Sequence, residues 1–265
     1  TQDASSPEHR EELDIVDFEI MEEIRARVDD VIDDPAVAEK LKPWYGKHCK
    51  RITFHDEYLP TFNQPNVHLV DTDGRGIEQI TPGGAVVAGE EFELDLIVFA
   101  SGFEVTTDQH QRLGFDPAGR GGIRLSERWH DGAHSLHGIL SAEFPNMMML
   151  GIVQAGFGTN FVHFLQNSAR HVAWLVAHCE AEGINTIEAS PEAEEEWLMV
   201  LYGAVGGMPD YSLNCTPSYY NSEGNRGPKA ARNLTYIGSL LDYDGYLQRW
   251  RAAGVEGEFP GVTVS

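Results

Sequence analysis

The stretch ELDLIVFASGFE, Glu93–Glu104, indicates the fold class of this chain more strongly than any other. Its centre, Leu96–Ala100, is a continuous apolar run, which is typical of a strand buried on both faces. Such strands belong to the parallel sheets of α/β proteins, where ligands bind beside the carboxyl ends of the strands. The run ends at Ser101 and Gly102, and glycine lets a ligand approach the backbone closely. We therefore predict an α/β fold, with either a ligand site or an ordinary tight turn at Gly102.

A second strand end is predicted later in the chain. The segment FPNMMMLGIVQ, Phe144–Gln154, has the composition of a buried strand, and a glycine-rich loop and a helix follow it. Free N–H groups at a helix N-terminus favour negative charge, so Ala155–Phe161 suits an electron-rich group. The loop has neither the GxGxxG pattern nor the lysine of a P-loop. Ligand binding and a plain strand–loop–helix connection are both open here.

The first third of the chain predicts helices. An amphipathic helix is expected over Glu11–Ile32 because apolar side chains recur on one face. These side chains are Met21, Ile24, Val28 and Val31. Asp34 precedes Pro35, which predicts an N-cap and the first position of a second helix that ends near Leu41. A third, short helix is expected through Phe62, with Asp56 as its cap.

Strands and further helices are expected after this region. Asn66–Val70 predicts a short strand, and Gly76–Phe103 predicts two or three strands joined by TPGG and AGEE turns. Helices are expected from Phe161 onward, in the acidic segment SPEAEEEWLMVLYG, and near GYLQRWRAAG at the end of the chain.

Composition restricts the partners of the chain. Its 265 residues include 42 acidic and 19 basic side chains, for a net charge of −23, so we expect neither nucleic acid nor an anionic membrane as a partner. It has no apolar run of about 18 residues and no apolar signal core, which predicts a cytoplasmic protein without a membrane span. Three separated cysteines favour free thiols, and the scattered histidines predict no metal site.

One basic pair stands out in this acidic chain. Lys50 and Arg51 are adjacent, with Lys47 just before them and Trp44 and Tyr45 upstream. Lysine and arginine often occupy helix ends on solvated surfaces, so the pair alone has two interpretations. One is surface decoration, and the other is a functional cation site.

Four stretches, taken in order, resemble the C-terminal part of the Baeyer–Villiger monooxygenases, flavoproteins with two dinucleotide-binding domains. They are CKRITFHDEYLPTFNQPNVHLVDT (49–72), ELDLIVFASGFE (93–104), SERWHDGAHSLHGILSAEFPNMMML (126–150) and SLNCTPSYYNSEGNRGPKAARN (212–233). The resemblance covers nearly the whole chain. It implies an α/β fold that is the C-terminal portion of a two-domain, Rossmann-like flavoprotein.

The resemblance also implies a domain organisation. Residues 1–55 resemble the helical linker region, residues 56–104 the closing strands of the NADPH-binding domain, and residues 105–265 the returning segment of the FAD-binding domain with the C-terminal tail. The cofactors implied are FAD and NADPH. No GxGxxG occurs in the sequence, so the implied N-terminal FAD-binding half is a further part of the same polypeptide or a separate chain.

The site residues follow from the same resemblance. Arg51 matches the catalytic arginine, a cation at any working pH that stabilises a peroxide anion on the flavin, and Lys50 matches a neighbour that contacts NADP(H). The implied cofactor-binding residues are Lys50, Gly102, Phe103, Gln154, Thr159, Asn160, Phe161 and Tyr219. Two positions depart from the family pattern. Ser101 stands where the family usually has threonine. Tyr219 stands where many members have a tryptophan, so an aromatic ring is kept but the indole N–H of the tryptophan is lost.

The implied activity is insertion of one oxygen atom of O2 into a small ketone, with NADPH, to give an ester or lactone. A related flavin monooxygenase that oxidises sulfur or nitrogen is the first alternative. The second is a non-catalytic partner subunit that has lost flavin binding. The sequence does not identify the ketone.

Overall fold

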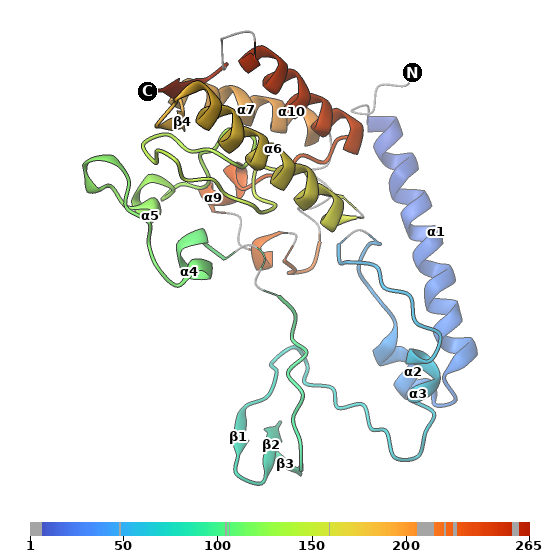
Figure 1. Cartoon of the computed structure of the whole chain (residues 1–265). Coiled ribbons are helices and arrows are strands. Elements are labelled where there is room, and N and C mark those ends of the chain that lie inside the picture. Colours follow the sequence, from blue (N-terminus) through green and yellow to red (C-terminus); the bar gives the residue numbers. More distant parts are fainter. Residues whose placement is uncertain are drawn as a thin grey trace. The chain divides into compact units, whose positions relative to one another are not determined.

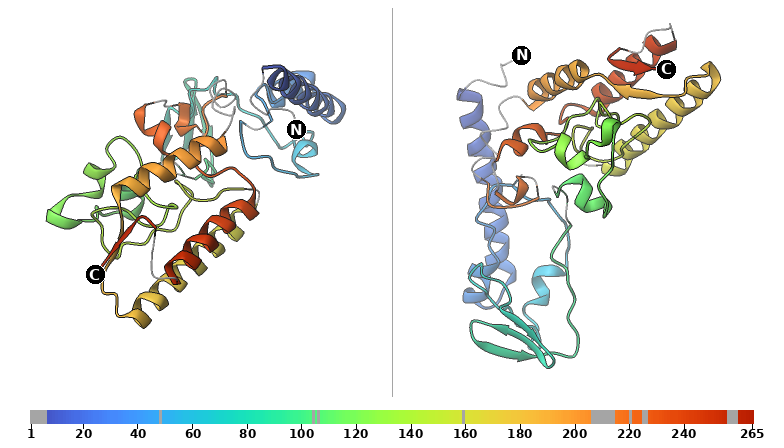
Figure 2. Two further views of the ribbon diagram at one scale, coloured as in Figure 1. Left: turned by 90° about the horizontal axis from the view of Figure 1, so that it is seen from above. Right: turned by 90° about the vertical axis from the view of Figure 1, so that its left-hand side faces the viewer.

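The computed structural model of the chain describes residues 7–47, 49–103, 105, 107–158, 160–205, 215–219, 221–224, 227–255 and 260–265. The chain divides into two compact units, Ser6–Phe103 and Glu104–Ser265. Each unit has a hydrophobic core of its own. Their elements are labelled in Figure 1 and seen from two further sides in Figure 2.

The first unit begins with the helices that the sequence predicts. Helix α1 spans Pro7–Val31 and helix α2 spans Pro35–Leu41. The side chain of Asp34 accepts a 2.8 Å hydrogen bond from the backbone N–H of Ala36, so the predicted cap is confirmed. The short helix α3, Tyr58–Thr61, is also present, but the predicted cap at Asp56 is wrong. Its N-cap is the next residue, which makes no side-chain capping bond.

The buried face of α1 differs from the expected one by one position. Met21, Val28 and Ile32 are buried, whereas Ile24 is 39% exposed. Arg25 takes the expected place of Ile24 on the buried face, with only 7% of its surface exposed. The buried residues therefore follow a four-three-four spacing that includes a charged side chain. The core of this unit is completed by Ala38, Val37, Leu41, Leu59 and Phe62.

A small antiparallel sheet follows. It has the order β1 (Gln79–Thr81), β2 (Gly84–Val87) and β3 (Glu90–Glu93), which confirms the two or three strands predicted for this region. Glycine is required at the start of β2, because a Cβ on Gly84 would lie 1.8 Å from the backbone oxygen of Phe92. All three strands lie within residues 79–93, so their pairing is local in sequence.

Two predicted strands of this unit are absent. Neither Asn66–Val70 nor Leu96–Ala100 pairs with another described segment. Leu96, Val98 and Phe99 are 75–77% exposed, although their sequence is typical of a fully buried strand. Figure 1 shows this segment continuing from β3 as a plain coil. A strand satisfies its backbone groups only through neighbours, and the described residues supply none here.

The second unit is built around long helices. Helix α6 (Phe161–Glu182) and helix α10 (Leu240–Val255) lie side by side in Figures 1 and 2, and α7 spans Pro191–Val205. These three helices confirm the predictions for the second half. Strands β4 (Ile187–Ala189) and β5 (Val262–Val264) pair in antiparallel fashion. Among the described residues, no helix is long and apolar enough to cross a membrane.

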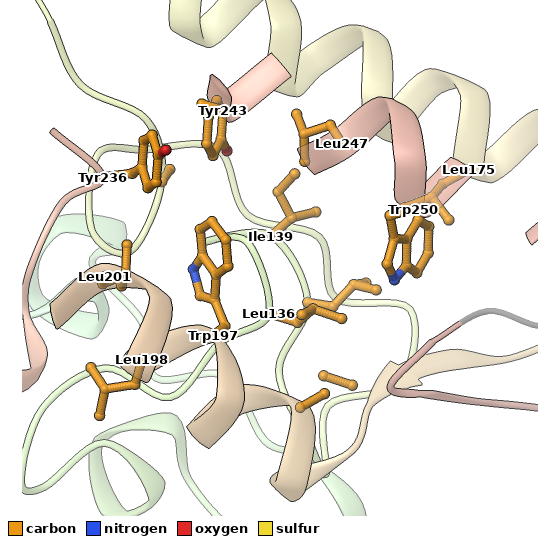
Figure 3. Packing of buried hydrophobic residues seen from close by; sticks show 14 of the residues in the cluster. Leu136, Ile139, Leu175, Trp197, Leu198, Leu201, Tyr236, Tyr243, Leu247 and Trp250 are labelled. Carbon is orange, nitrogen blue, oxygen red and sulfur yellow. The ribbon is translucent and has the colours of Figure 1, made fainter. Parts of the chain in front are cut away.

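Short elements fill the rest of this unit. They are α4 (Gln109–Leu113), η1 (Arg120–Gly122), α5 (Leu125–Arg128), η2 (Ser222–Gly224) and α9 (Pro228–Arg232). The core between the helices is aromatic, and Figure 3 shows Trp197 among Tyr236, Tyr243, Leu136 and Ile139. The ring of Trp197 stacks on that of Tyr236 with 6.1 Å between centroids. This core supports the loop that precedes α6.

The predicted strand Phe144–Gln154 is wrong. Asn146 and Gln154 have φ angles of 61° and 55°, which lie outside the range of a strand. Within this segment Met148 makes an isolated bridge with Leu140, which lies before it, and the chain then turns toward α6. Its apolar side chains serve a core of helices and turns, which a run of apolar residues does not distinguish from a sheet.

The cysteines differ from expectation in part. Cys179 is a buried free thiol. Cys49 and Cys215 are each disulfide-bonded, so the expectation of three free thiols is wrong for these two residues.

Candidate functional site

The cation pair lies in irregular backbone after α2. Lys50 is half-buried, and its Nζ lies 5.4 Å from the ring centroid of Tyr45. Arg51 is exposed, and the described residues give it no hydrogen bond or ion pair. The first cation is therefore held against an aromatic ring, while the second is accessible to an anion supplied by another segment.

The segment before the pair is fixed to α1 by a residue that the sequence analysis missed. The Nη1 atom of Arg25 donates a 2.8 Å hydrogen bond to the backbone oxygen of Pro43, and its guanidinium lies 4.8 Å from the ring centroid of Trp44. Asp17 of the same helix accepts a hydrogen bond from the backbone N–H of Lys47. The sequence signal was the four-residue spacing from Met21 to Arg25, which places the arginine on the buried face.

The predicted strand end at Gly102 has an unusual backbone. Its φ is +107°, a conformation that side chains rarely adopt, and a Cβ there would meet no atom within 4 Å. The requirement for glycine is therefore conformational within this chain. Phe103 follows with 87% of its surface exposed. Both residues present surface that a ligand or another segment can cover.

Gln154 does not expose its side chain. It is fully buried, and its Oε1 accepts hydrogen bonds from the backbone N–H and the hydroxyl of Ser135 at 2.9 and 2.7 Å. Its Nε2 donates to the backbone oxygens of Ala133 and Arg232 at 2.7 and 3.1 Å. The side chain has no hydrogen-bonding group left for a ligand, so Gln154 supports the loop from behind.

The glycines after Gln154 are packed against aromatic rings. A Cβ on Gly156 would lie 2.3 Å from the ring of Phe164 and 2.7 Å from that of Tyr243. A Cβ on Gly158 would lie 2.8 Å from Phe164. Tyr236 pairs with Gly156 in a parallel bridge. The loop therefore needs glycine because its backbone lies directly on the core.

The start of α6 presents two of the predicted residues. Asn160 is the exposed N-cap, and its side chain accepts a 3.1 Å hydrogen bond from the backbone N–H of His163. Phe161 is the first helical residue, and its ring lies 6.3 Å from that of Phe157. The remaining N–H groups of the first turn have no partner within the helix. Thr159 lies outside the described residues.

Tyr219 is half-buried in a turn that Asn221 organises. The Oδ1 of Asn221 accepts from the backbone N–H groups of Ser218 and Gly224 at 2.9 and 3.0 Å. Its Nδ2 donates to the backbone oxygen of Thr216 at 3.1 Å. An asparagine that closes turns in this way is a local signal that the sequence analysis overlooked.

Buried ionisable groups lie in the core of the second unit. Burial lowers the pKa of His137 and of His171 to about 3, because the charged imidazolium loses its hydration. Burial also raises the pKa of Glu194, which Arg128 and Ser141 contact. None of these groups belongs to the predicted site.

The predicted residues form two sets. Lys50, Arg51, Gly102 and Phe103 belong to the first unit, and Gln154, Asn160, Phe161 and Tyr219 to the second. Two hollows of the second unit contain none of them, and the larger of the two has a volume of about 320 Å³. Within the described ranges, no group of three metal-ligating side chains lies together. Arg51, Gly102, Phe103 and Asn160 are the exposed members of the two sets.

Known proteins resemble this chain over most of its length. Pentalenolactone D synthase of Streptomyces arenae is 45% identical over 240 residues, which are 90% of this chain and 41% of the relative. The FAD-binding monooxygenase hmp7 of Hypomyces subiculosus is 40% identical and is matched over 93% of this chain and 40% of its own length. A Baeyer–Villiger monooxygenase of Streptomyces coelicolor is 41% identical, with coverages of 92% and 40%. No protein-family model matches.

Solved structures agree with these relatives. The polycyclic ketone monooxygenase from Thermothelomyces thermophila superposes with a TM-score of 0.83 at 36% identity, covering 98% of this chain and 42% of that one. Cyclohexanone monooxygenase from Rhodococcus sp. Phi1, bound to NADP+, gives 0.79 at 28% identity, with coverages of 98% and 46%. These neighbours confirm the predicted fold class, an α/β portion of a flavoprotein with two dinucleotide-binding domains.

The chain spans about 40% of the length of the curated relatives that it matches. The chain belongs to the Baeyer–Villiger monooxygenases and corresponds to their C-terminal part.

Proposed function

We propose that this chain, together with an N-terminal FAD-binding half, is a monooxygenase that converts a ketone to an ester or lactone with O2 and NADPH. The observation that carries the proposal is similarity over at least 92% of the chain to a Baeyer–Villiger monooxygenase and to a polycyclic ketone monooxygenase. Ketones are the proposed substrate class, and the cytoplasm is the proposed location.

FAD and NADPH are the proposed cofactors. One relative is named an FAD-binding monooxygenase, and one structural neighbour was solved with NADP+. When bound, the flavin supplies oxygen activation and NADPH supplies the hydride that reduces it. The exposed members of the two sets of residues are suited to contact such groups, because they present a cation, a positive-φ glycine and a helix start.

Arg51 is the proposed catalytic residue. Its guanidinium is exposed, stays charged and offers a planar fork of donors, so it can hold a negatively charged oxygen beside the flavin. A preorganised donor of this kind lowers a barrier by about 3–4 kcal/mol in comparable anion-binding sites. Lys50, held against Tyr45, is proposed to contact NADP(H).

The other proposed contacts are distributed over both units. Gly102 and Phe103 are proposed to contact the dinucleotides, and Asn160 and Phe161 the flavin and substrate pocket. Thr159 remains part of the proposal by its position in the sequence. Tyr219 is proposed to contact NADP(H) through its ring. Gln154 is proposed to support the loop that follows it without contacting a cofactor.

The N-terminal half is the proposed partner, in the same polypeptide or as a second chain. Supporting this, the chain covers 41% of a 45%-identical relative, and the apolar run Leu96–Ala100 has no neighbouring strand among the described residues. We propose residues 1–55 as the linker region, 56–104 as closing strands of the NADPH-binding domain, and 105–265 as the returning FAD segment and tail. The partner half would bury the exposed run in a parallel sheet.

The test is purification of the complete protein with both halves. The expected result is a yellow protein that oxidises NADPH with O2 and converts a cyclic ketone to a lactone, detected by mass spectrometry. A thioether offered in parallel distinguishes the alternative of sulfur oxidation. A colourless complex of both halves that consumes no NADPH would contradict the proposal and favour the non-catalytic partner subunit.

A further inference from the structure

We propose that Gln154 is a positioning residue that sets the backbone of Ala155–Gly158 and, through it, the start of α6 at Asn160 and Phe161. The inference rests on the proposed function, because it concerns the loop that is proposed to contact the flavin. Gln154 itself touches no ligand in this proposal. Its role is to hold the contacting residues in one conformation.

The side chain of Gln154 connects two segments that are distant in sequence. Its two accepted hydrogen bonds fix Ser135, and its two donated bonds fix Ala133 and Arg232. A planar amide that donates twice and accepts twice satisfies all four groups at once. Glutamate and methionine have the same length but cannot make this set of bonds. The pattern therefore selects glutamine specifically.

The backbone of Gln154 is held as firmly as its side chain. Its N–H donates a 2.7 Å hydrogen bond to the oxygen of Leu234, and its oxygen accepts a 2.8 Å bond from the indole Nε1 of Trp197. The φ angle of +55° is uncommon for a residue with a side chain. Six hydrogen bonds around one buried residue maintain this strained turn. The turn sets the direction in which the backbone continues from the core into the loop Ala155–Gly158.

The loop beyond the turn follows a second set of contacts. The oxygen of Ala155 accepts from the N–H of Tyr236 at 2.8 Å, and the N–H of Phe157 donates to the oxygen of Tyr236 at 3.1 Å. Gly156 lies between these bonds, directly on Phe164 and Tyr243. A rotation at Gln154 would therefore break the pairing with Tyr236 and shift the helix start that follows.

The experiment uses the complete flavoprotein with the variants Gln154→Met and Gln154→Glu. Asn146→Leu is the matched control, because Asn146 also has a positive φ, of 61°, and its side chain also bridges two backbone groups, the oxygen of Asn185 and the N–H of Ile187, which lie outside the loop. The first readout is hydrogen exchange at the amides of Ala155 and Phe157. We expect Gln154→Met to accelerate it about tenfold and the control to change it less than about twofold.

The second readout is the visible circular dichroism of the bound flavin together with hydrogen peroxide released per NADPH. We expect Gln154→Met to alter the spectrum and to release at least about fivefold more peroxide, because misplaced groups lose a large part of their effect. Gln154→Glu should recover toward the wild type as the pH is lowered, because a protonated carboxyl again donates one hydrogen bond. The control should retain the wild-type spectrum and peroxide yield.

Unchanged exchange at Ala155 and Phe157 in Gln154→Met, with wild-type spectrum and peroxide yield, would overturn the proposal while leaving the proposed function intact. A wild-type protein that binds no flavin would instead remove the proposed function. In that case the exchange measurement still decides whether Gln154 sets the loop.

Discussion

The Nη2 atom of Arg128 lies 2.5 Å from Oε2 of Glu194, whose side chain is completely buried. The other carboxylate oxygen accepts from the backbone N–H of Ala142 at 2.7 Å and from the hydroxyl of Ser141 at 3.1 Å. This pair connects α5 to α7 through the core of the second unit. A buried charge that loses its partner is far more costly than the intact pair is favourable.

Arg128→Met should lower the free energy of unfolding of the complete protein by about 3–5 kcal/mol. The measurement is a urea titration in which hydrogen exchange of the α7 amides reports unfolding. Burial already raises the pKa of Glu194 above 4.5, and removal of the cation should raise it further. The folded state then keeps a proton that the unfolded state releases above about pH 4.5. The variant should therefore lose stability as the pH rises from 5 to 8, and a pH-independent loss would contradict this explanation.

Arg51→Ala should retain FAD and at least part of flavin reduction by NADPH, but ester formation should fall by about 10²–10³-fold. The proposed role requires a fixed positive charge beside the reacting oxygen, which this variant lacks, while the exposed arginine supports no described core contact. Arg51→Lys keeps the charge without the planar fork and should be intermediate. Stopped-flow reduction and product analysis measure the two steps separately, and a normal ester yield from Arg51→Ala would exclude the assignment.

Buried histidines should make the second unit sensitive to acid. The pKa of His171 is lowered to about 3, first by burial and then by His137 and Arg251. A lowered pKa means that the unfolded state binds protons first, so stability is present above pH 6.5 and is lost as the pH falls toward 3. The free energy of unfolding should therefore be lower at pH 4.5 than at pH 7.5. Replacing one such histidine should reduce this difference by about 2–3 kcal/mol.

His171→Phe is the variant for this measurement, because its ring already packs against Trp250 at 5.3 Å between centroids. His178→Phe, at a half-buried position of the same helix, is the control and should keep the acid sensitivity. Equal slopes of stability against pH in both variants would show that the buried imidazole is not the cause.

Gly156→Ala should destabilise the protein by about 1–3 kcal/mol, because its Cβ would enter the ring of Phe164. Gly151→Ala is the matched control in the same region, since a Cβ there meets nothing within 4 Å, and it should change stability by less than about 0.5 kcal/mol. Thermal unfolding of the two variants compares them directly. Similar melting temperatures would mean that the loop does not lie on the core as described.

The sequence predicts the helices well because their signals are local. Asp34 caps α2 as its position before a proline indicates, and the periodicity after Phe161 continues through α6. The prediction that Ile24 lies on the buried face of α1 is wrong, because Arg25 lies there instead. The guanidinium of Arg25 lies over the rings of Trp44 and Phe18 and donates to the oxygen of Pro43, so a charged side chain is accommodated on this face.

The outcome for the two absent strands and the role of Gln154 depend on residues far away in the chain. Leu96–Ala100 has the composition of a buried strand but no described neighbour to pair with, so composition and structure differ. Gln154 lies 19 residues from Ser135 and 78 from Arg232, and no local pattern reveals these hydrogen bonds. The sequence identified the loop as important and could not show that its glutamine faces inward.

The exposed run Leu96–Ala100 also bears on how the protein is made. When the proposed N-terminal half belongs to the same polypeptide, this segment leaves the ribosome after it, so its proposed neighbours are already synthesised when it emerges. Expressed by itself, the chain would present these exposed apolar side chains to other copies, so we expect it to aggregate. A two-plasmid system that produces both halves in the same cell should therefore yield soluble material, whereas mixing them after separate expression should not.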